Sequence, residues 1–232
     1  MNADFIILCG GQGTRLRSTI GESQKVMAAV GDEDEPFLDL LLNYIGKQGV
    51  QRVILSTGYK AQDVEKHYAS GKFQGMTIEF SREDSPLGTG GAIKKACGLV
   101  QTDNFFVLNG DSFCPVHFKN MSDQHIAHKV HVTLAVSKVS DGQDYGTITL
   151  DAEGRITAFA EKVGSGAGYV NAGVYCFKRG IEALMPKEEK FSLEKDFFQS
   201  LDSKLFDSFK VSVPFFDIGT PERYELAKKY LK

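Results

Sequence analysis

The stretch Phe5-Ile-Ile-Leu-Cys-Gly-Gly-Gln-Gly-Thr-Arg-Leu-Arg17 joins a short apolar run to a glycine-rich loop. Five consecutive apolar residues predict a strand that is buried on both faces, as in a parallel sheet. Open parallel sheets bind ligands at the carboxyl ends of their strands, where the loop 10–13 falls. Its glycines leave backbone N–H groups accessible to an anion, and Arg15 and Arg17 supply charged donors. The stretch predicts an anion site; a tight turn with surface arginines is the alternative.

Beyond this stretch, short apolar runs alternate with amphipathic helical patterns through the first half of the chain. Such alternation predicts an α/β fold with a mostly parallel sheet and helices on each face. The expected strands are residues 5–9, 52–56, 76–80 and 105–109, and the expected helices are residues 37–48, 61–68 and 91–99.

After about residue 111 adjoining apolar runs predict a more antiparallel second half. No linker rich in Pro, Ser or Gly separates the halves, so we expect a single domain, 1–232, with halves of about 1–112 and 113–232. The expected strands are residues 130–139, 146–150, 158–161, 173–177 and 211–216, and the expected helices are residues 192–201 and 221–231.

Composition narrows the class of protein. The 232 residues are 42% hydrophobic and 25% charged, which is typical of a globular chain and excludes disorder. A net charge of -3 gives no reason to expect a nucleic acid or a membrane as partner. The first apolar run is too short for a signal peptide, and four scattered cysteines suit a reducing compartment, so we expect a cytoplasmic protein. The oligomeric state, including a homo-oligomer, stays open.

Two other phosphate-binding motifs do not fit. A dinucleotide fingerprint that starts at Gly11 requires a third glycine where Leu16 stands, and no P-loop pattern occurs in the chain. A nicotinamide oxidoreductase and a P-loop enzyme are therefore both disfavoured. His125, His128 and His131 have a regular spacing, but a helix that ends near residue 129 would not place them on one face, so we interpret them as solvated or partly packed rather than as metal ligands.

The glycine-rich loop followed by Lys25 resembles the signature of the sugar-phosphate nucleotidylyltransferases. Within that family the likeness is greatest to the D-glycero-α-D-manno-heptose 1-phosphate guanylyltransferases. The resemblance implies a Rossmann-like, three-layer fold with a mixed, mostly parallel central sheet. It runs through further blocks in the family's order: Pro86-Leu-Gly-Thr-Gly-Gly-Ala92, Asn109-Gly-Asp-Ser-Phe113, Tyr145-Gly-Thr-Ile148, Phe159-Ala-Glu-Lys162, Val170-Asn-Ala-Gly-Val-Tyr175 and Phe216-Asp-Ile-Gly-Thr-Pro-Glu222.

The reaction that this resemblance implies transfers a nucleoside monophosphate from a nucleoside triphosphate to a sugar 1-phosphate, with release of pyrophosphate. Positioning and charge neutralisation would do most of the catalytic work. The catalytic candidates are Arg15, on the leaving phosphates, and Lys25, at the α-phosphate. A protein that binds nucleotide sugars without turnover is the alternative outside the enzyme class.

A nucleotide site in the first half is implied by the same blocks. Glu83 occupies the position expected to read the base, and a carboxylate accepts both hydrogen bonds that guanine N1–H and N2–H donate. We therefore expect GTP, with UTP or dTTP and a hexose 1-phosphate as the alternative; as a further alternative, Glu83 belongs to an exposed polar turn. The implied nucleotide-binding residues are Leu8, Gly10, Gly11, Gly13, Thr14, Arg15, Glu83, Gly88, Thr89, Asn109 and Asp111.

The sugar phosphate and a metal complete the implied site. Mg²⁺ is expected as the cofactor, held by Asp111 and Asp217, because hard cations that bridge phosphates use few carboxylates. As an alternative to metal binding, Asp111 forms a turn together with the preceding Asn109-Gly110. The implied sugar-phosphate-binding residues are Gly146, Glu161, Lys162 and Asn171.

The chain departs from the family at one motif. Gln24-Lys25-Val26 stands where the family usually has Pro-Lys-Pro. Two prolines restrict their own backbone and that of the preceding residue, so their absence predicts a less rigid loop around Lys25.

Overall fold

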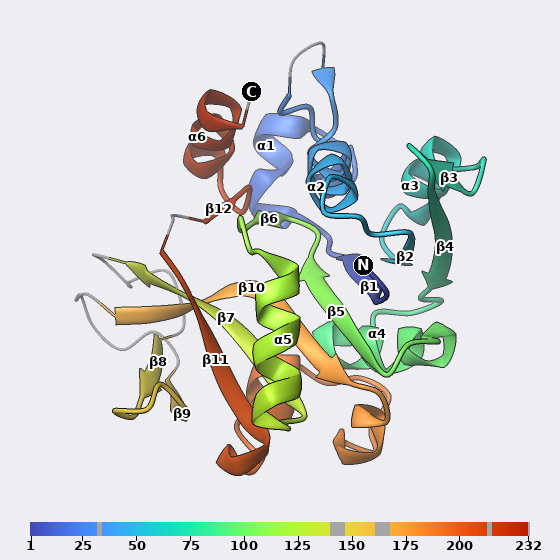
Figure 1. Cartoon of the computed structure of the whole chain (residues 1–232). Coiled ribbons are helices and arrows are strands. Elements are labelled where there is room, and N and C mark those ends of the chain that lie inside the picture. The colour runs from blue at the N-terminus through green and yellow to red at the C-terminus, as the bar shows by residue number, and fades with distance from the viewer. Residues whose placement is uncertain (32–33, 140–146, 161–167, 213–214, 232) are drawn as a thin grey trace.

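The computed structural model describes residues 1–31, 34–139, 147–160, 168–212 and 215–231. Their dominant feature is one mixed sheet with helices on both faces (Figure 1). Strand β1 (Asp4–Cys9) lies inside it, parallel to β2 (Arg52–Thr57) and to β5 (Asn104–Asn109). The order along the sheet is β11-β7-β10-β5-β1-β2-β4-β3, so strands from the two halves of the chain share it.

The parallel side matches the sequence prediction closely. Strand β4 (Met76–Arg82) extends the parallel set beside β2, and the short β3 (Lys72–Phe73) closes the edge in antiparallel orientation. The helices between these strands are α2 (Phe37–Gly46), α3 (Ala61–His67) and α4 (Gly88–Ala96).

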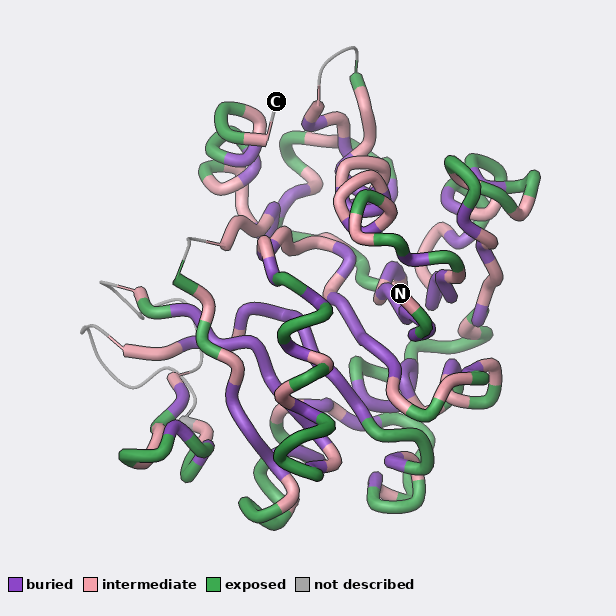
Figure 2. Tube along the Cα trace, viewed as in Figure 1, coloured by how far each residue is buried: buried purple, intermediate pink, exposed green. Residues whose placement is uncertain are grey.

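Alternating side chains of β1 build a core on each face of the sheet. Phe5 and Ile7 pack with residues of α2, α3 and α5 (Phe118–His128), and Ile6 packs on the other face with Ile93 of α4. Figure 2 shows the central strands buried along most of their length. Burial on both faces explains why β1 reads as a continuous apolar run rather than an alternating one.

Helix α4 begins three residues earlier than the pattern predicts. Its first turn contains glycines, which form helices poorly, and this hides the helix start in the sequence. The reason for the glycines is contact: a Cβ built on Gly90 would clash with the ring of Phe191, so only glycine lets this turn approach that side chain.

The second half is more antiparallel, as expected. Strand β10 (Gly168–Lys178) runs antiparallel to both β5 and β7 (Val132–Val139), and a hairpin of β8 (Thr147–Leu150) and β9 (Ile156–Ala160) extends from it. The final helix, α6 (Pro221–Tyr230), begins at the expected proline.

The late strand and one late helix differ from the prediction. The expected strand at 211–216 is instead β11 (Phe206–Val211), parallel to β7, and the short β12 (Phe216–Asp217) pairs with β6 (Ser112–Phe113). Asp207 hid β11 in the sequence, because a buried carboxylate is unusual in a strand. The expected helix at 192–201 is a π-helix, η6 (Leu193–Phe198). Within the described residues, no helix has the length and apolar character needed to span a bilayer.

Candidate active site

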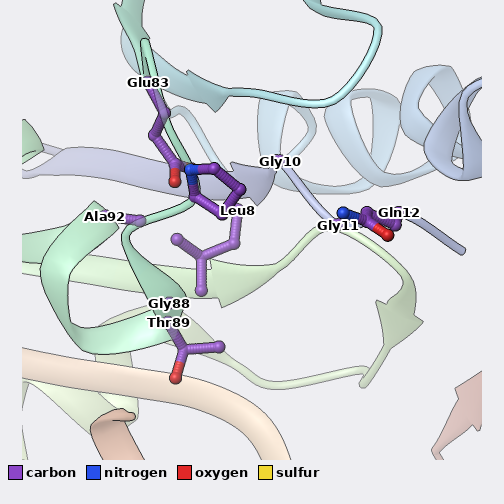
Figure 3. Close-up of a pocket in the computed structure, with 9 residues that line it drawn as sticks. Leu8, Gly10, Gly11, Gln12, Glu83, Gly88, Thr89 and Ala92 are labelled. Carbon is purple, nitrogen blue, oxygen red and sulfur yellow. The ribbon is translucent and has the colours of Figure 1, made fainter. Parts of the chain in front are cut away.

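A pocket of about 230 Å³ opens at the carboxyl ends of β1 and β4. Figure 3 shows Glu83 and Thr89 on either side of Leu8, with the glycine-rich loop beside them. Six of the expected nucleotide-binding residues line it: Leu8, Gly10, Gly11, Glu83, Gly88 and Thr89. Gln12, Pro86 and Ala92, which we did not predict, complete the lining.

Glu83 lies in this pocket rather than in an exposed polar turn. Its backbone N–H donates to Thr57 O at 2.7 Å, which continues the sheet beyond β4. Oε2 accepts the Leu87 N–H at 2.9 Å. Oε1 faces the glycine loop, since a Cβ built on Gly10 would lie 2.5 Å from it. Burial raises the pKa of the Glu83 carboxyl, although the Leu87 N–H opposes that shift.

A second pocket of about 180 Å³ continues from the first. The two share Leu8, Gly11 and Thr89, so they form one continuous depression along the end of β1. The other expected residues that line it are Lys25, Asn109 and Asp111. The structure therefore brings the predicted base-reading carboxylate and the predicted phosphate-binding lysine to opposite ends of one site.

Lys25 is buried and paired. Only 8% of the residue is exposed, and its Nζ donates to Asp111 Oδ2 at 2.5 Å. Its stem packs on the glycine loop, where a Cβ on Gly13 would lie 2.9 Å from Lys25 Cβ. Gly13 has φ +58°, a left-handed conformation that favours glycine. The ammonium group is thus held at the boundary between loop and pocket.

Gln24 is a site residue that the sequence analysis missed. Its side chain is fully buried, and its Nε2 donates to Cys9 O at the end of β1. Its Oε1 accepts the Val26 N–H at 2.6 Å. The turn around Lys25, expected to be less rigid without prolines, is therefore tied to β1 through a side-chain amide. No local pattern reveals these partners, because the bond to Cys9 spans 15 positions.

The predicted carboxylates Asp111 and Asp217 lie on adjoining segments. Ile218 N–H donates to Asp111 O at 3.0 Å, and β12 pairs with β6. Asp111 Oδ1 accepts the Ser112 hydroxyl at 3.2 Å, whereas both oxygens of Asp217 accept from Arg223. Among the described residues no group of three or more His, Cys, Asp or Glu side chains is placed to hold a metal. Two carboxylates nevertheless fit Mg²⁺, which keeps phosphate and water ligands.

Arg15 and Thr14 lie in a short 3-10 turn (Thr14–Leu16) and are exposed. The Arg15 guanidinium lies near Asp217: a Cβ on Gly219 would be 3.5 Å from Arg15 Nη2 and 2.7 Å from Asp217 Oδ1. Arg15 thus stands beside the carboxylate predicted to hold the metal, and neither residue is among those that line the two pockets.

The sugar side is described in part. Asn171 donates from Nδ2 to Tyr175 Oη at 2.7 Å and accepts the Gly173 N–H at 2.8 Å. A Cβ on Gly173 would lie 2.9 Å from Asn109 Nδ2, so the turn that the Asn171 side chain holds adjoins the predicted nucleotide-binding residue Asn109. The predicted Gly146, Glu161 and Lys162 lie outside the described residues.

A second missed residue, Glu194 of the π-helix, joins the two sides. Thr89 Oγ1 donates to Glu194 Oε2 at 3.1 Å and accepts the Leu193 N–H at 2.9 Å. Burial and then the nearby Glu194 carboxylate raise the pKa of the Tyr175 hydroxyl well above its usual value. A polar route therefore runs from Thr89 in the nucleotide pocket to Asn171.

The histidines do not form a shared site. His125 is buried and its Nδ1 lies 2.8 Å from Thr133 Oγ1, whereas His128 is half exposed and pairs with Asp207 at 2.7 Å. The interpretation as solvated or partly packed holds for His128 and His131 but is wrong for His125, which is 1% exposed.

Comparison with known proteins agrees with this geometry. The family model described as nucleotidyl transferase matches residues 5–232. The chain is 40% identical over 230 residues to the D-glycero-alpha-D-manno-heptose 1-phosphate guanylyltransferase of Aneurinibacillus thermoaerophilus, covering 99% of this chain and 98% of the relative. It is 34% identical to the mannose-1-phosphate guanylyltransferase of Mycobacterium tuberculosis, covering 95% of this chain and 62% of that relative.

A solved structure has a similar fold. The crystal structure of HddC from Yersinia pseudotuberculosis complexed with GMP-PN superimposes with a TM-score of 0.88 at 35% identity, over 99% of this chain and 100% of that one. The predicted family resemblance and the predicted Rossmann-like fold with a mixed, mostly parallel sheet are confirmed.

Proposed function

The chain belongs to the nucleotidyl transferase family, and from that premise we propose that it transfers GMP from GTP to a sugar 1-phosphate, giving a GDP-sugar and pyrophosphate. The preferred acceptor is D-glycero-α-D-manno-heptose 1-phosphate. The observation that carries the choice of base is the Glu83 carboxylate, which faces Gly10 inside the pocket. The proposal extends to the whole chain, with residues 1–112 binding the nucleotide and 113–232 the sugar phosphate.

The base assignment follows from hydrogen-bond chemistry. Guanine presents N1–H and N2–H side by side, and a carboxylate accepts from both. Uracil and thymine present one N–H between two carbonyls, which an acceptor-only group cannot satisfy. Oε1 of Glu83 faces the pocket while Oε2 is held by the Leu87 N–H, so the group is fixed in orientation before the base arrives.

The transfer is an in-line displacement. An oxygen of the sugar phosphate bonds to the α-phosphorus of GTP, the bond from that phosphorus to the bridging oxygen of the β-phosphate breaks, and pyrophosphate leaves with the bond's electron pair. Lys25, which lines the smaller pocket, neutralises charge at the α-phosphate, and Arg15 neutralises charge on the leaving group. Both act mainly by position and charge.

The remaining roles are assigned by place. Asp111 and Asp217, on adjoining segments, would hold Mg²⁺, which when bound neutralises phosphate oxygens. Glycines 10, 11 and 13, with Thr14, Gly88, Thr89 and Asn109, shape the nucleotide side around Leu8. Asn171 contacts the sugar, joined in the part outside the described residues by Gly146, Glu161 and Lys162.

A matrix of substrates tests the proposal. Pyrophosphate release is measured with GTP, UTP, dTTP and ATP against heptose, mannose and glucose 1-phosphates. We expect GTP with the heptose phosphate to give the highest kcat/KM, with mannose 1-phosphate second, because both share the manno configuration. Preference for UTP or dTTP would overturn the base assignment. Nucleotide binding without pyrophosphate release from any pair would favour the non-catalytic alternative.

A further inference from the structure

The amide of Gln24 joins three segments that must keep a fixed relation for the reaction. Nε2 donates to Cys9 O, the last residue of β1, and lies 3.5 Å from Gly11 O in the glycine loop. Oε1 accepts the Val26 N–H at 2.6 Å, on the far side of Lys25. Both ends of one side chain are thus used, and no part of the residue is exposed.

The backbone of Gln24 closes the same turn. Met27 N–H donates to Gln24 O at 2.9 Å, and Ala28 N–H donates to Lys25 O at 3.1 Å. Lys25 therefore stands in a 3-10 turn that is capped at its start by the Gln24 side chain. The stem of Lys25 has little room to adjust, since its Cβ packs directly against Gly13.

The carbonyl bonds also orient the loop. In a trans peptide the N–H points away from the C=O, so anchoring the Cys9 carbonyl to Gln24 directs the Gly10 N–H away from Gln24. Gly10 and Gly11 line the larger of the two pockets. Preorganised donors are worth more in catalysis than donors that must be reoriented.

We propose that Gln24 is a positioning residue of the transfer reaction, which fixes the Lys25 ammonium relative to the glycine loop. The inference rests on the proposed function. The hydrogen bonds of Gln24 hold the turn that two prolines would restrict through the backbone. Its own backbone, at φ -66° and ψ 133°, already has the extended conformation that proline favours.

Gln24→Met tests the proposal, because methionine keeps the size and flexibility of the side chain but neither donates nor accepts. Gln48→Met is the matched control. The Gln48 amide forms the same kind of bridge, from Nε2 to Val116 O at 3.1 Å and from Phe118 N–H to Oε1 at 3.1 Å, and Gln48 lines neither pocket of the site. Gln24→Met loses three hydrogen bonds and Gln48→Met loses two, so a general loss of stability affects both variants.

We expect Gln24→Met to lower kcat by about 10- to 100-fold, since displacement of a catalytic group by an ångström has effects of this size. Gln48→Met keeps kcat within about twofold, because Gln48 lines neither pocket of the site. Thermal unfolding of both variants shows that each is folded at the assay temperature. Gln24→Met also raises the Kd for GTP, measured by calorimetry, more than Gln48→Met does.

A double-mutant cycle with Lys25→Ala gives the second readout. If Gln24 acts through Lys25, the loss of kcat in the double variant falls well short of the product of the single losses. The positioning role is overturned if the loss of kcat in the double variant equals the product of the two single losses. It is also overturned if the kcat and the Kd for GTP of Gln24→Met match those of Gln48→Met. Turnover of the unmodified enzyme is the separate test of the proposed function: its absence refutes that function, whereas unchanged kcat in Gln24→Met refutes only the role of Gln24.

Discussion

The Nζ of Lys25 lies 2.5 Å from Oδ2 of Asp111, so the proposed phosphate-binding cation and the proposed metal ligand form one ion pair. The lysine side chain is 10% exposed and the aspartate side chain 37% exposed. Each charge is therefore set in place by the other before substrates bind. Substrate phosphates would exchange partners within this pair rather than attract a mobile side chain.

Replacement of this lysine is the first prediction. Lys25→Met should lower kcat by about 10²-fold or more, because removal of one preorganised charge at a reacting phosphate has effects of this order. Pyrophosphate release at saturating substrates measures it. Lys119→Met is the control, since the Lys119 side chain is 73% exposed and pairs with Asp123 of the same helix. A Lys25→Met enzyme that retains a third of its turnover contradicts the assignment.

The metal assignment predicts dependence on Mg²⁺. Chelation with EDTA should abolish turnover, and added Mg²⁺ should restore it, because the carboxylates would hold the cation with the phosphates. Asp111→Asn should raise the half-saturating Mg²⁺ concentration by about tenfold or more, within the range found when groups that support a bound metal are changed. Asp123→Asn, on an exposed residue, should not. Full turnover in the presence of EDTA would show that the reaction does not need Mg²⁺.

Base selection is tested at Glu83. Glu83→Gln should lower kcat/KM for GTP by about 10- to 100-fold, since the carboxamide presents a donor where guanine also donates. The kcat/KM for UTP or dTTP should fall less. The ratio of kcat/KM for GTP to kcat/KM for UTP or dTTP is therefore the quantity to compare. Asp84→Asn is the neighbouring control, with a side chain 93% exposed. An unchanged ratio in Glu83→Gln shows that this residue does not read the base.

The sequence predicts those parts of the fold whose signals are local. The apolar run of β1 and the helical pattern of α2 place both elements within a few residues of their observed bounds. Strand β11 was misplaced because Asp207 interrupts its pattern. That buried carboxylate pairs with Gln124 and His128 of α5, partners that the sequence around β11 does not show.

The same distinction applies to the site. Asp111 stands in the block Asn109–Phe113 and Glu83 is placed by its spacing before Gly88, and the structure brings both to the connected pockets. Gln24 and Glu194 carry no such pattern. Their partners lie on other elements, and Thr89 is 105 positions from Glu194, so only the folded chain shows what these side chains hold.

Acid should destabilise the fold through His125. Burial lowers the pKa of this imidazole to about 4, with Lys178 and His131 adding to the shift and Asp207 opposing it. The neutral ring is favoured in the folded state, so its contribution is complete above the unfolded pKa of about 6.5 and is lost as pH falls from there toward 4. The full loss is about 3 kcal/mol.

Chemical denaturation at several pH values between 7 and 4 measures how steeply the free energy of unfolding falls with pH. His125→Gln, which keeps a hydrogen-bonding group beside Thr133, should flatten it. His117→Gln, at an exposed position, should leave it unchanged. Equal slopes in all three proteins would assign the acid sensitivity to groups other than His125.

Gly10 offers a way to move Glu83 without replacing it. A Cβ at position 10 would lie 2.5 Å from Glu83 Oε1, so Gly10→Ala should turn the carboxylate out of the orientation that the Leu87 N–H holds and leave the backbone fold intact. The ratio of kcat/KM for GTP to that for UTP should fall by about tenfold, since the fixed orientation of the acceptor is lost.

Gly11→Ala is the matched variant for that experiment. Apart from its own chain neighbours, no atom of the described residues would lie within 4 Å of that Cβ, so Glu83 stays in place. Because Gly11 lines the pocket, the added methyl group can hinder every nucleotide, but it should do so without changing the ratio between GTP and UTP. Thermal unfolding should be similar in both variants. If Gly10→Ala and Gly11→Ala change the ratio equally, the contact between Gly10 and Glu83 has no part in choosing the base.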